Sequence, residues 1–320
     1  MTENAPRATH LRKTASVNPS PVRLAVVGTL AFDDVATPAG AVQGVLGGSA
    51  TYFSVAATLF TRVGLVGVVG EDFPERFRAV LASRDMDLSG LETARGRTFH
   101  WAGRYDGALA AATTLETDLN VLEAFSPTLT DAAKAAPFVF LANLSPETQL
   151  SVLAQLEGPR LVVADTMNFW IASARATLLR VLEKVDGLMV NDEEAKSLSG
   201  EHNLISAGKR LLTLGPKFAI VKKGEHGAFL FARDRSFALP SYPLDSVKDP
   251  TGAGDSFAGG LMGALAARGG TSSADLVQAM VYGTVTASFA VSEFSVDGLA
   301  RVTRGDVEVR AEELRRFVAL

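Results

Sequence analysis

A glycine-rich segment near the C-terminal end of the chain carries two carboxylates where a helix is expected to begin. Residues 248–260 read KDPTGAGDSFAGG and continue into the apolar, helix-like stretch LMGALAARG. Glycine lets backbone N–H groups converge, and a helix N-terminus adds unpaired N–H groups and positive partial charge. We therefore expect the amides of Gly252, Ala253 and Gly254 to form an anion hole for a phosphate or for charge that develops in a transition state.

Asp255 would lie in the first turn of this helix, where the helix dipole favours its ionised form. In phosphoryl transfer the attacking hydroxyl needs orientation and late proton removal more than strong activation, and a carboxylate can supply both. The segment therefore suits a phosphoryl donor that faces a hydroxyl acceptor. A helix cap with a tight glycine turn is the alternative that Gly-Ala-Gly-Asp leaves open when it is taken alone.

Apolar runs of strand length alternate with helical stretches and must position this segment. The runs are at 22–28, 62–72, 136–144, 160–165, 187–192 and 218–224. Continuous apolar runs are typical of strands buried on both faces, as in a parallel sheet. Among the helical stretches, the one at 47–60 follows two glycines and is expected to be amphipathic, and another covers 171–184. The order predicts an α/β fold, a doubly wound parallel sheet with helices on both sides.

Residues 31–46 and about 93–118 are richer in Thr, Ala, Gly and aromatic residues and alternate more strongly. We expect them to form a small β lid outside the main sheet. Lid side chains suit stacking on a sugar face or a nucleobase, or packing onto the body or a second lid in a dimer. They are Phe99, His100, Trp101 and Tyr105. Residues 1–20 are polar and have no signal-peptide core, so we expect a disordered tail before a single domain over 21–320.

The composition excludes several classes of protein. The net charge is −4, so no basic face for nucleic acid is expected. No apolar stretch is long enough for a membrane helix. The chain has no cysteine, which excludes a disulfide scaffold, a thiolate nucleophile and a cysteine-bound zinc, and fits the cytoplasm. The four histidines show no metal-binding spacing.

The segment DPTGAGDSFAGGLM (249–262) resembles, along its whole length, the C-terminal signature of the ribokinase-like carbohydrate kinases of the PfkB type. The resemblance extends over 22–318 and implies an ATP-dependent kinase that phosphorylates a hydroxyl of a small sugar or sugar-like acceptor. It implies that Asp255 is the general base, and that ATP and Mg²⁺ are the cofactors. Some family members also need K⁺ near this loop, and Asp249 and Thr251 match part of that site.

Two further segments resemble the nucleotide site of this family. VNDEEA (190–195) looks like its N-x-x-E motif, which implies that Asn191 and Glu194 hold Mg²⁺ and its waters, Glu194 through water. Taken alone, this pattern is usually a helix start. VKKGEHGAFLF (221–231) resembles the family's turn beneath the nucleotide, where Gly224 and Gly227 match and Lys222 takes the place of a small polar residue that faces the phosphates. A hairpin turn explains this segment equally well.

The N-terminal half resembles the family's acceptor site. GTLAFDD (28–34) parallels a segment whose aspartate binds acceptor hydroxyls, which falls on Asp33, and a carboxylate can accept two hydrogen bonds from a vicinal diol. LGGSATYF (46–53) parallels a turn that lets the acceptor approach the backbone, here at Gly47 and Gly48, whereas Tyr52 replaces the usual asparagine. Asn143 ends a central strand and is expected to point at the cleft.

Other functions remain open from the sequence. A nucleoside (adenosine-type) kinase would have the same fold, and a non-catalytic sugar or nucleotide sensor would not need Asp255. A nicotinamide-dependent oxidoreductase would need a GxGxxG fingerprint, which the chain lacks, as it lacks a GxxxxGK[ST] P-loop. The segment DTMNFW (165–170) only loosely resembles the D-x-N-x-R segment of kinases for acidic sugars, because its arginine is missing. The expected partner is a small sugar or nucleoside, with a possible homodimer through the lid.

Overall fold

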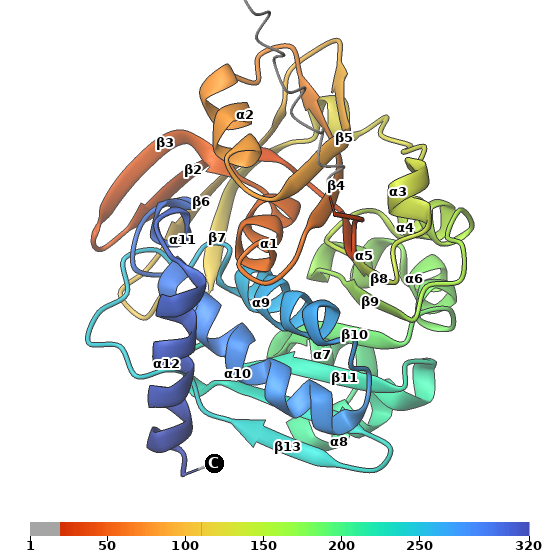
Figure 1. Cartoon of the computed structure of the whole chain (residues 1–320), viewed down its shortest axis with the longest axis vertical. Coiled ribbons are helices and arrows are strands. Elements are labelled where there is room, and N and C mark those ends of the chain that lie inside the picture. The colour runs from red at the N-terminus through yellow and green to blue at the C-terminus, as the bar shows by residue number, and fades with distance from the viewer. Residues whose placement is uncertain (1–19, 110, 320) are drawn as a thin grey trace, which may run out of the picture.

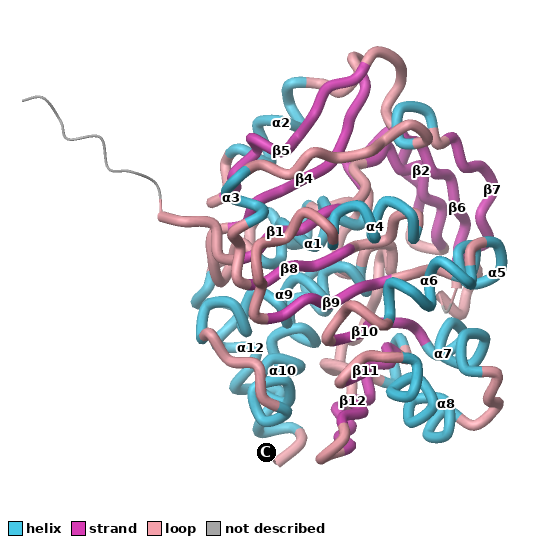
Figure 2. The backbone as a smooth tube through the Cα atoms, turned by 90° about the vertical axis from the view of Figure 1, so that its right-hand side faces the viewer, coloured by secondary structure: helices cyan, strands magenta, loops and turns pink. Residues whose placement is uncertain are grey.

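The computed structural model describes residues 20–109 and 111–319, so residues 1–19 of the predicted tail lie outside the described part. Figure 1 shows the chain from its N-terminal strands to the helices of its C-terminal third, and Figure 2 shows how the strands stack side by side. No helix in the described ranges combines the length and the apolar character needed to cross a membrane.

The larger sheet has nine strands in the order β13-β12-β11-β10-β9-β8-β1-β4-β5. They are β1 (Leu24–Val27), β4 (Val63–Gly70), β5 (Met86–Ala94), β8 (Phe138–Leu141), β9 (Leu161–Asp165), β10 (Gly187–Asn191), β11 (Phe218–Lys222), β12 (Ala228–Ala232) and β13 (Ser236–Leu239). All neighbours from β5 to β11 pair in parallel, and β12 runs antiparallel between β11 and β13. β1 and β8 are buried at every position because helices cover both faces of the sheet.

Two helical layers enclose this sheet (Figure 1). One layer contains α1 (Ser49–Ala57), α2 (Glu75–Ala82), α9 (Ala253–Arg268), α10 (Ser273–Ala290), α11 (Asp297–Ala300) and α12 (Arg304–Phe317). The other contains α3 (Asp131–Lys134), α4 (Pro146–Leu153), α5 (Asn168–Ser173), α6 (Arg175–Leu182), α7 (Asp192–Ser199) and α8 (Leu204–Leu211). Along β8, Phe138 and Phe140 face the first layer, whereas Val139 and Leu141 face the second. The predicted doubly wound α/β fold is confirmed.

A smaller sheet stands at the carboxyl end of β1, with strand order β3-β2-β6-β7. Its strands are β2 (Ala31–Thr37), β3 (Gly40–Gly47), β6 (Phe99–Tyr105) and β7 (Ala112–Asp118). The chain enters it directly after β1 and leaves it into α1, and it enters again after β5. Residues 93 and 94 end β5 of the larger sheet instead.

Two helix predictions were wrong in detail. The helix predicted over 47–60 is α1, and all of its residues are buried, so it is not amphipathic. It lies between the sheet, where Phe53 stacks on Phe140 with ring centroids 4.4 Å apart, and α9, which covers its other side. The helix predicted over 171–184 is two helices, α5 and α6, because Ala174 leaves the helical region with φ −130° and ψ 29°.

Candidate active site

The glycine-rich segment forms the N-terminus of α9, as its sequence predicts. The helix begins at Ala253, directly after its N-cap Gly252, whose φ of +72° lies in the left-handed region that favours glycine. The amide of Ala253 donates to the Pro250 carbonyl at 3.1 Å, so it is less available than expected. Among the described residues, the amides of Gly252 and Gly254 have no hydrogen-bond acceptor. We call these two unpaired amides at the start of α9 the amide hole.

Asp255 follows the amide hole in the first turn of α9 and keeps some contact with solvent. Burial of the carboxyl group by the surrounding protein raises its pKa to about 7, and the nearby Asp165 adds to this shift. The ammonium of Lys222 opposes the shift without cancelling it. The position in the first helical turn therefore does not by itself keep this carboxyl ionised below about pH 7, because the loss of hydration raises its pKa. A carboxylate with a raised pKa is a stronger base once it is ionised.

Asp165, Asn191 and Lys222 end three adjacent parallel strands, β9, β10 and β11. Lys222 Nζ lies 3.0 Å from Asp165 Oδ2, and a Cβ built on Gly254 would lie 3.1 Å from the same nitrogen. Burial alone would lower the pKa of Lys222, but the carboxylates of Asp165 and Glu194 raise it. Sequence reasoning missed Asp165. Its signals were an acidic residue at the end of an apolar strand and the first position of DTMNFW, a segment that suggested only a site for acidic sugars.

Asn191 and Glu194 form a reciprocal cap at the start of α7. The Glu194 amide donates to Asn191 Oδ1 and the Asn191 amide donates to Glu194 Oε2, both at 2.8 Å. The helix-start interpretation therefore describes these two residues correctly. Glu194 Oε1 remains available, and burial followed by the charge of Asp165 raises the pKa of Glu194 to about 7. A carboxylate oxygen beside Asp165 and Asp255 fits the hard-oxygen chemistry of a water-bound Mg²⁺.

Gly224 and Gly227 form the turn between β11 and β12. Both have positive φ, at +54° and +83°, and the Lys223 amide donates to the Gly227 carbonyl at 2.8 Å. The segment is thus the hairpin turn that the sequence left open. It follows Lys222 directly, at the same edge of the sheet as the amide hole.

Asp33 approaches Asp255 from β2 of the small sheet. It is only 3% exposed, and burial raises its pKa to about 8, with added contributions from Asp249 and Asp255. The amide of Gly48 opposes the shift, and the backbone of Gly47 lies so close to the carboxyl that a Cβ would overlap it. Asp33, Gly47, Gly48 and Asp255 are therefore brought together from distant parts of the chain.

The lid side chains divide between the two faces of the small sheet. Trp101 pairs in register with Asp33 and shares its face, and the Tyr105 hydroxyl accepts a hydrogen bond from Thr251 Oγ1 at 3.3 Å. His100 lies on the opposite face, where its Nε2 is 3.4 Å from Asp34 Oδ2. The interpretation that includes His100 among the stacking residues was therefore wrong.

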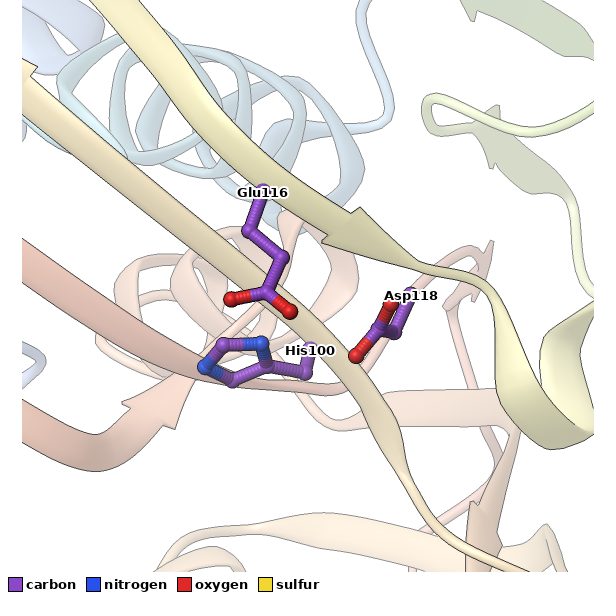
Figure 3. Close-up of side chains that lie close together, drawn as sticks. All are labelled: His100, Glu116 and Asp118. Atoms are coloured by element: carbon purple, nitrogen blue, oxygen red, sulfur yellow. The ribbon is translucent and has the colours of Figure 1, made fainter.

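Figure 3 shows His100 beside Glu116 and Asp118 of β7. One ligand atom from each of the three side chains lies within 4.8 Å of the others. Because His100 faces away from Asp33, this group lies on the opposite face of the small sheet.

Asn143 is fixed to the residues around α5. Its Nδ2 donates to Met167 Sδ at 3.1 Å, and its Oδ1 accepts from Trp170 Nε1 at 3.1 Å. Both ends of the amide therefore have a partner within the protein. One Nδ2 hydrogen and one Oδ1 lone pair stay unused by these two bonds, so the expected direct contact with an acceptor stays a prediction.

Asp249 and Thr251 form a turn just before α9. The Thr251 amide donates to Asp249 Oδ1 at 2.8 Å. Asp249 is 1% exposed, and its Oδ2 has no hydrogen-bond partner among the described residues. A buried carboxylate oxygen without a hydrogen-bond partner is a suitable ligand for a monovalent cation such as K⁺.

Comparisons with known proteins identify the family and the fold of the chain. A family model described as pfkB family carbohydrate kinase matches residues 21–300. The cytidine kinase of Thermococcus kodakarensis is 31% identical over 248 residues, which cover 75% of this chain and 87% of that protein. The nucleoside kinase of Methanocaldococcus jannaschii has a similar structure, with a TM-score of 0.73 at 22% identity over 92% of this chain and 99% of that one. A putative ribokinase II of E. coli, solved with ATP and Mg²⁺, gives a TM-score of 0.74 at 19% identity over 91% and 99%.

Proposed function

Since the chain belongs to the pfkB family of carbohydrate kinases, we propose that it transfers the γ-phosphate of ATP to a hydroxyl of a nucleoside, with Asp255 as general base. Membership makes the chain a phosphotransferase that acts on a sugar or nucleoside alcohol, and the family uses ATP with Mg²⁺. A nicotinamide-dependent oxidoreductase is thereby excluded.

The convergence of Asp33 and Asp255 at the amide hole carries the proposal. Once ionised, Asp33 accepts hydrogen bonds from two vicinal hydroxyls of the acceptor, which orients a third hydroxyl toward Asp255. Asp255 takes the proton of that hydroxyl late in the reaction. The amides of Gly252 and Gly254 donate hydrogen bonds to the phosphoryl group during transfer. Mg²⁺, held by Glu194 through water, supplies positive charge along the triphosphate when it is bound.

A nucleoside is favoured over a free sugar by two observations. The cytidine kinase similarity extends over most of both chains. Trp101 also shares the face of Asp33 and offers a planar apolar surface to a base. We propose that the small sheet acts as a lid that excludes water from this site, and its use in a homodimer stays a prediction.

A free sugar is the second candidate, because Asp33 would bind the diol of a pentose or hexose in the same way. A screen of nucleosides and sugars with ATP and Mg²⁺, read by ADP release, tests the proposal. We expect kcat/KM to be highest for a ribonucleoside, and cytidine is the first to try. A free sugar as the best acceptor would favour the second candidate. A screen without any turnover would contradict both candidate acceptors.

We also propose that K⁺ binds at Asp249 and Thr251 and supports the start of α9. The unpartnered Oδ2 of Asp249 supports this role. Replacing K⁺ by tetramethylammonium at constant ionic strength should lower kcat of the unaltered protein. Asp249→Asn should remove the difference between the two salts. Equal kcat in both salts for the unaltered protein would contradict the proposed role of K⁺.

A further inference from the structure

The ammonium group of Lys222 lies at an unusual place for a cation. A helix N-terminus carries positive partial charge, so a neighbouring ammonium is repelled there unless negative charge is also present. Lys222 Nζ nevertheless lies beside Gly254, in the first turn of α9, and its side chain is only 17% exposed. A buried cation at this position suits a site that receives a multiply charged anion.

Asp165 fixes the ammonium at this position. Its Oδ1 accepts from the Thr166 amide at 2.7 Å, and its carbonyl accepts from Gln149 Nε2 at 3.0 Å. The remaining oxygen, Oδ2, accepts from Lys222 at 3.0 Å. Asp165 is therefore held by its own backbone and by α4, while only one of the three ammonium donors of Lys222 is used by it.

Two other carboxylates compete for the same ammonium. Both Glu194 and Asp255 raise the pKa of Lys222 through their charges, after Asp165 in size. Without Asp165, the ammonium of Lys222 would be attracted toward the carboxylate of Glu194 or toward that of Asp255. Either movement would remove positive charge from the amide hole, and pairing with Asp255 would also make that carboxylate a poorer proton acceptor.

We propose that Lys222 binds the terminal phosphate of the nucleotide at the amide hole and that Asp165 is the positioning residue that holds it there. The inference rests on the proposed kinase function. The two remaining donors of Lys222 would add to the amides of Gly252 and Gly254 and meet the oxygens of the group that is transferred. In the simpler alternative, Lys222 only neutralises the buried Asp165 and has no contact with the nucleotide.

Binding of nucleotides without turnover separates these two roles. Calorimetric titration with the analogue AMP-PNP and with ADP, both with Mg²⁺ and without acceptor, compares ligands with and without a terminal phosphate. Lys222→Met should weaken AMP-PNP by about ten- to a hundredfold, the value of a charge-assisted hydrogen bond, and ADP by much less. Lys222→Arg keeps the charge and should restore part of this difference. Equal losses for both ligands, or no loss, would overturn the role of Lys222.

A double-mutant cycle tests the role of Asp165. Asp165→Asn should also weaken AMP-PNP more than ADP, and adding it to Lys222→Met should have little further effect, because its influence is exerted through Lys222. Independent, additive losses would show that Asp165 does not position Lys222. Should Lys222→Met fail to fold, the comparison of Asp165→Asn with Lys222→Arg still decides, since selective loss of AMP-PNP in the first and its retention in the second are required.

Neighbouring residues provide matched controls. Lys223 follows Lys222, but its ammonium lies over the ring of Phe229, 4.4 Å from the centroid. Asp186 forms a comparable pair with Lys217 at 2.7 Å, before the start of β10. Lys223→Met and Asp186→Asn should leave the affinity ratio of the two ligands unchanged. Failure of the unaltered protein to bind either nucleotide would count against the proposed function itself, whereas normal binding and turnover with an unchanged ratio in Lys222→Met would count only against this inference.

Discussion

The ring of Tyr52 lies directly against Gly252, the N-cap residue directly before α9. A Cβ at Gly252 would overlap the ring, and the left-handed φ of this residue is also unfavourable for any other side chain. Tyr52 is 1% exposed and belongs to α1, which lies beneath α9. The geometry of the amide hole therefore depends on the packing of two helices from opposite ends of the chain.

Gly252→Ala should impair catalysis more than stability. The added Cβ displaces the start of α9 and misaligns the amides, so kcat should fall by about tenfold or more. Steady-state kinetics with thermal unfolding checks this. Gly269→Ala is the matched control, because Gly269 caps the other end of the same helix with φ +71°, and its Cβ would meet only the ends of two arginine side chains, Arg160 at 3.4 Å and Arg23 at 3.9 Å. It should lose stability by about 1 kcal/mol and keep its kcat. Equal kcat losses in both variants would mean that helix strain alone explains the effect.

Activity should rise with pH through the pKa of Asp255. Below about 7 this carboxyl is largely protonated and cannot accept the proton of the acceptor, so kcat should increase across neutral pH and then level off. A pH profile of kcat with both ATP and acceptor at saturation measures the midpoint, because Asp33, with a pKa of about 8, affects acceptor binding and therefore kcat/KM. Because the Lys222 ammonium lowers the pKa of Asp255, Lys222→Met should move the midpoint to higher pH. A flat profile between about pH 5.5 and 8 would contradict Asp255 as the base.

Ionisation of the Asp33 carboxyl should lower the free energy of unfolding as the pH rises. The pKa of Asp33 is raised from the usual 3.8 to about 8, so the folded protein holds a proton that the unfolded chain releases. Its contribution to stability is therefore complete below pH 3.8 and is lost progressively up to about pH 8. Asp33→Asn removes this penalty, so its melting temperature should gain on that of the unaltered protein between about pH 5 and 8. A constant difference across this range would show that Asp33 is ionised throughout.

The stacked pair Phe53 and Phe140 should be a main support of α1. Phe53→Ala leaves a cavity between the sheet and α1, at a cost of about 3–5 kcal/mol in the free energy of unfolding. Chemical denaturation measures the loss. Phe317→Ala, at a position that is 63% exposed, should change the free energy of unfolding only slightly. A loss below about 1.5 kcal/mol for Phe53→Ala would show that α1 repacks without this ring.

Much of the fold could be predicted because local sequence patterns indicate where strands and helices begin and end. Strands buried on both faces appear in the sequence as continuous apolar runs, as in Phe138–Leu141. The glycine-rich turn predicts the start of α9. The complete burial of α1 could not be read in this way, since it depends on α9, which lies about 200 residues further along the chain. The break at Ala174 had no signal either, because neither proline nor glycine occurs there.

Some of the site residues could also be predicted from local sequence, whereas others depend on the fold. Asp33, Asp255 and the capping pair Asn191 and Glu194 belong to local patterns that identify them. The pairing of Asp165 with Lys222 does not, because it joins the ends of β9 and β11 across β10 and depends on sheet register. The raised pKa of Asp255 also escaped prediction, since it results from the protein packed around the carboxyl rather than from its position in the helix.

The central claim is that Asp255 accepts the proton of the attacking hydroxyl, and the kcat of Asp255→Asn tests it most directly. The amide has nearly the same shape but cannot take a proton, so kcat should fall by about 100- to 10,000-fold while AMP-PNP still binds with similar affinity. Turnover within a few fold of the unaltered protein, with the best acceptor at saturation, would contradict the account.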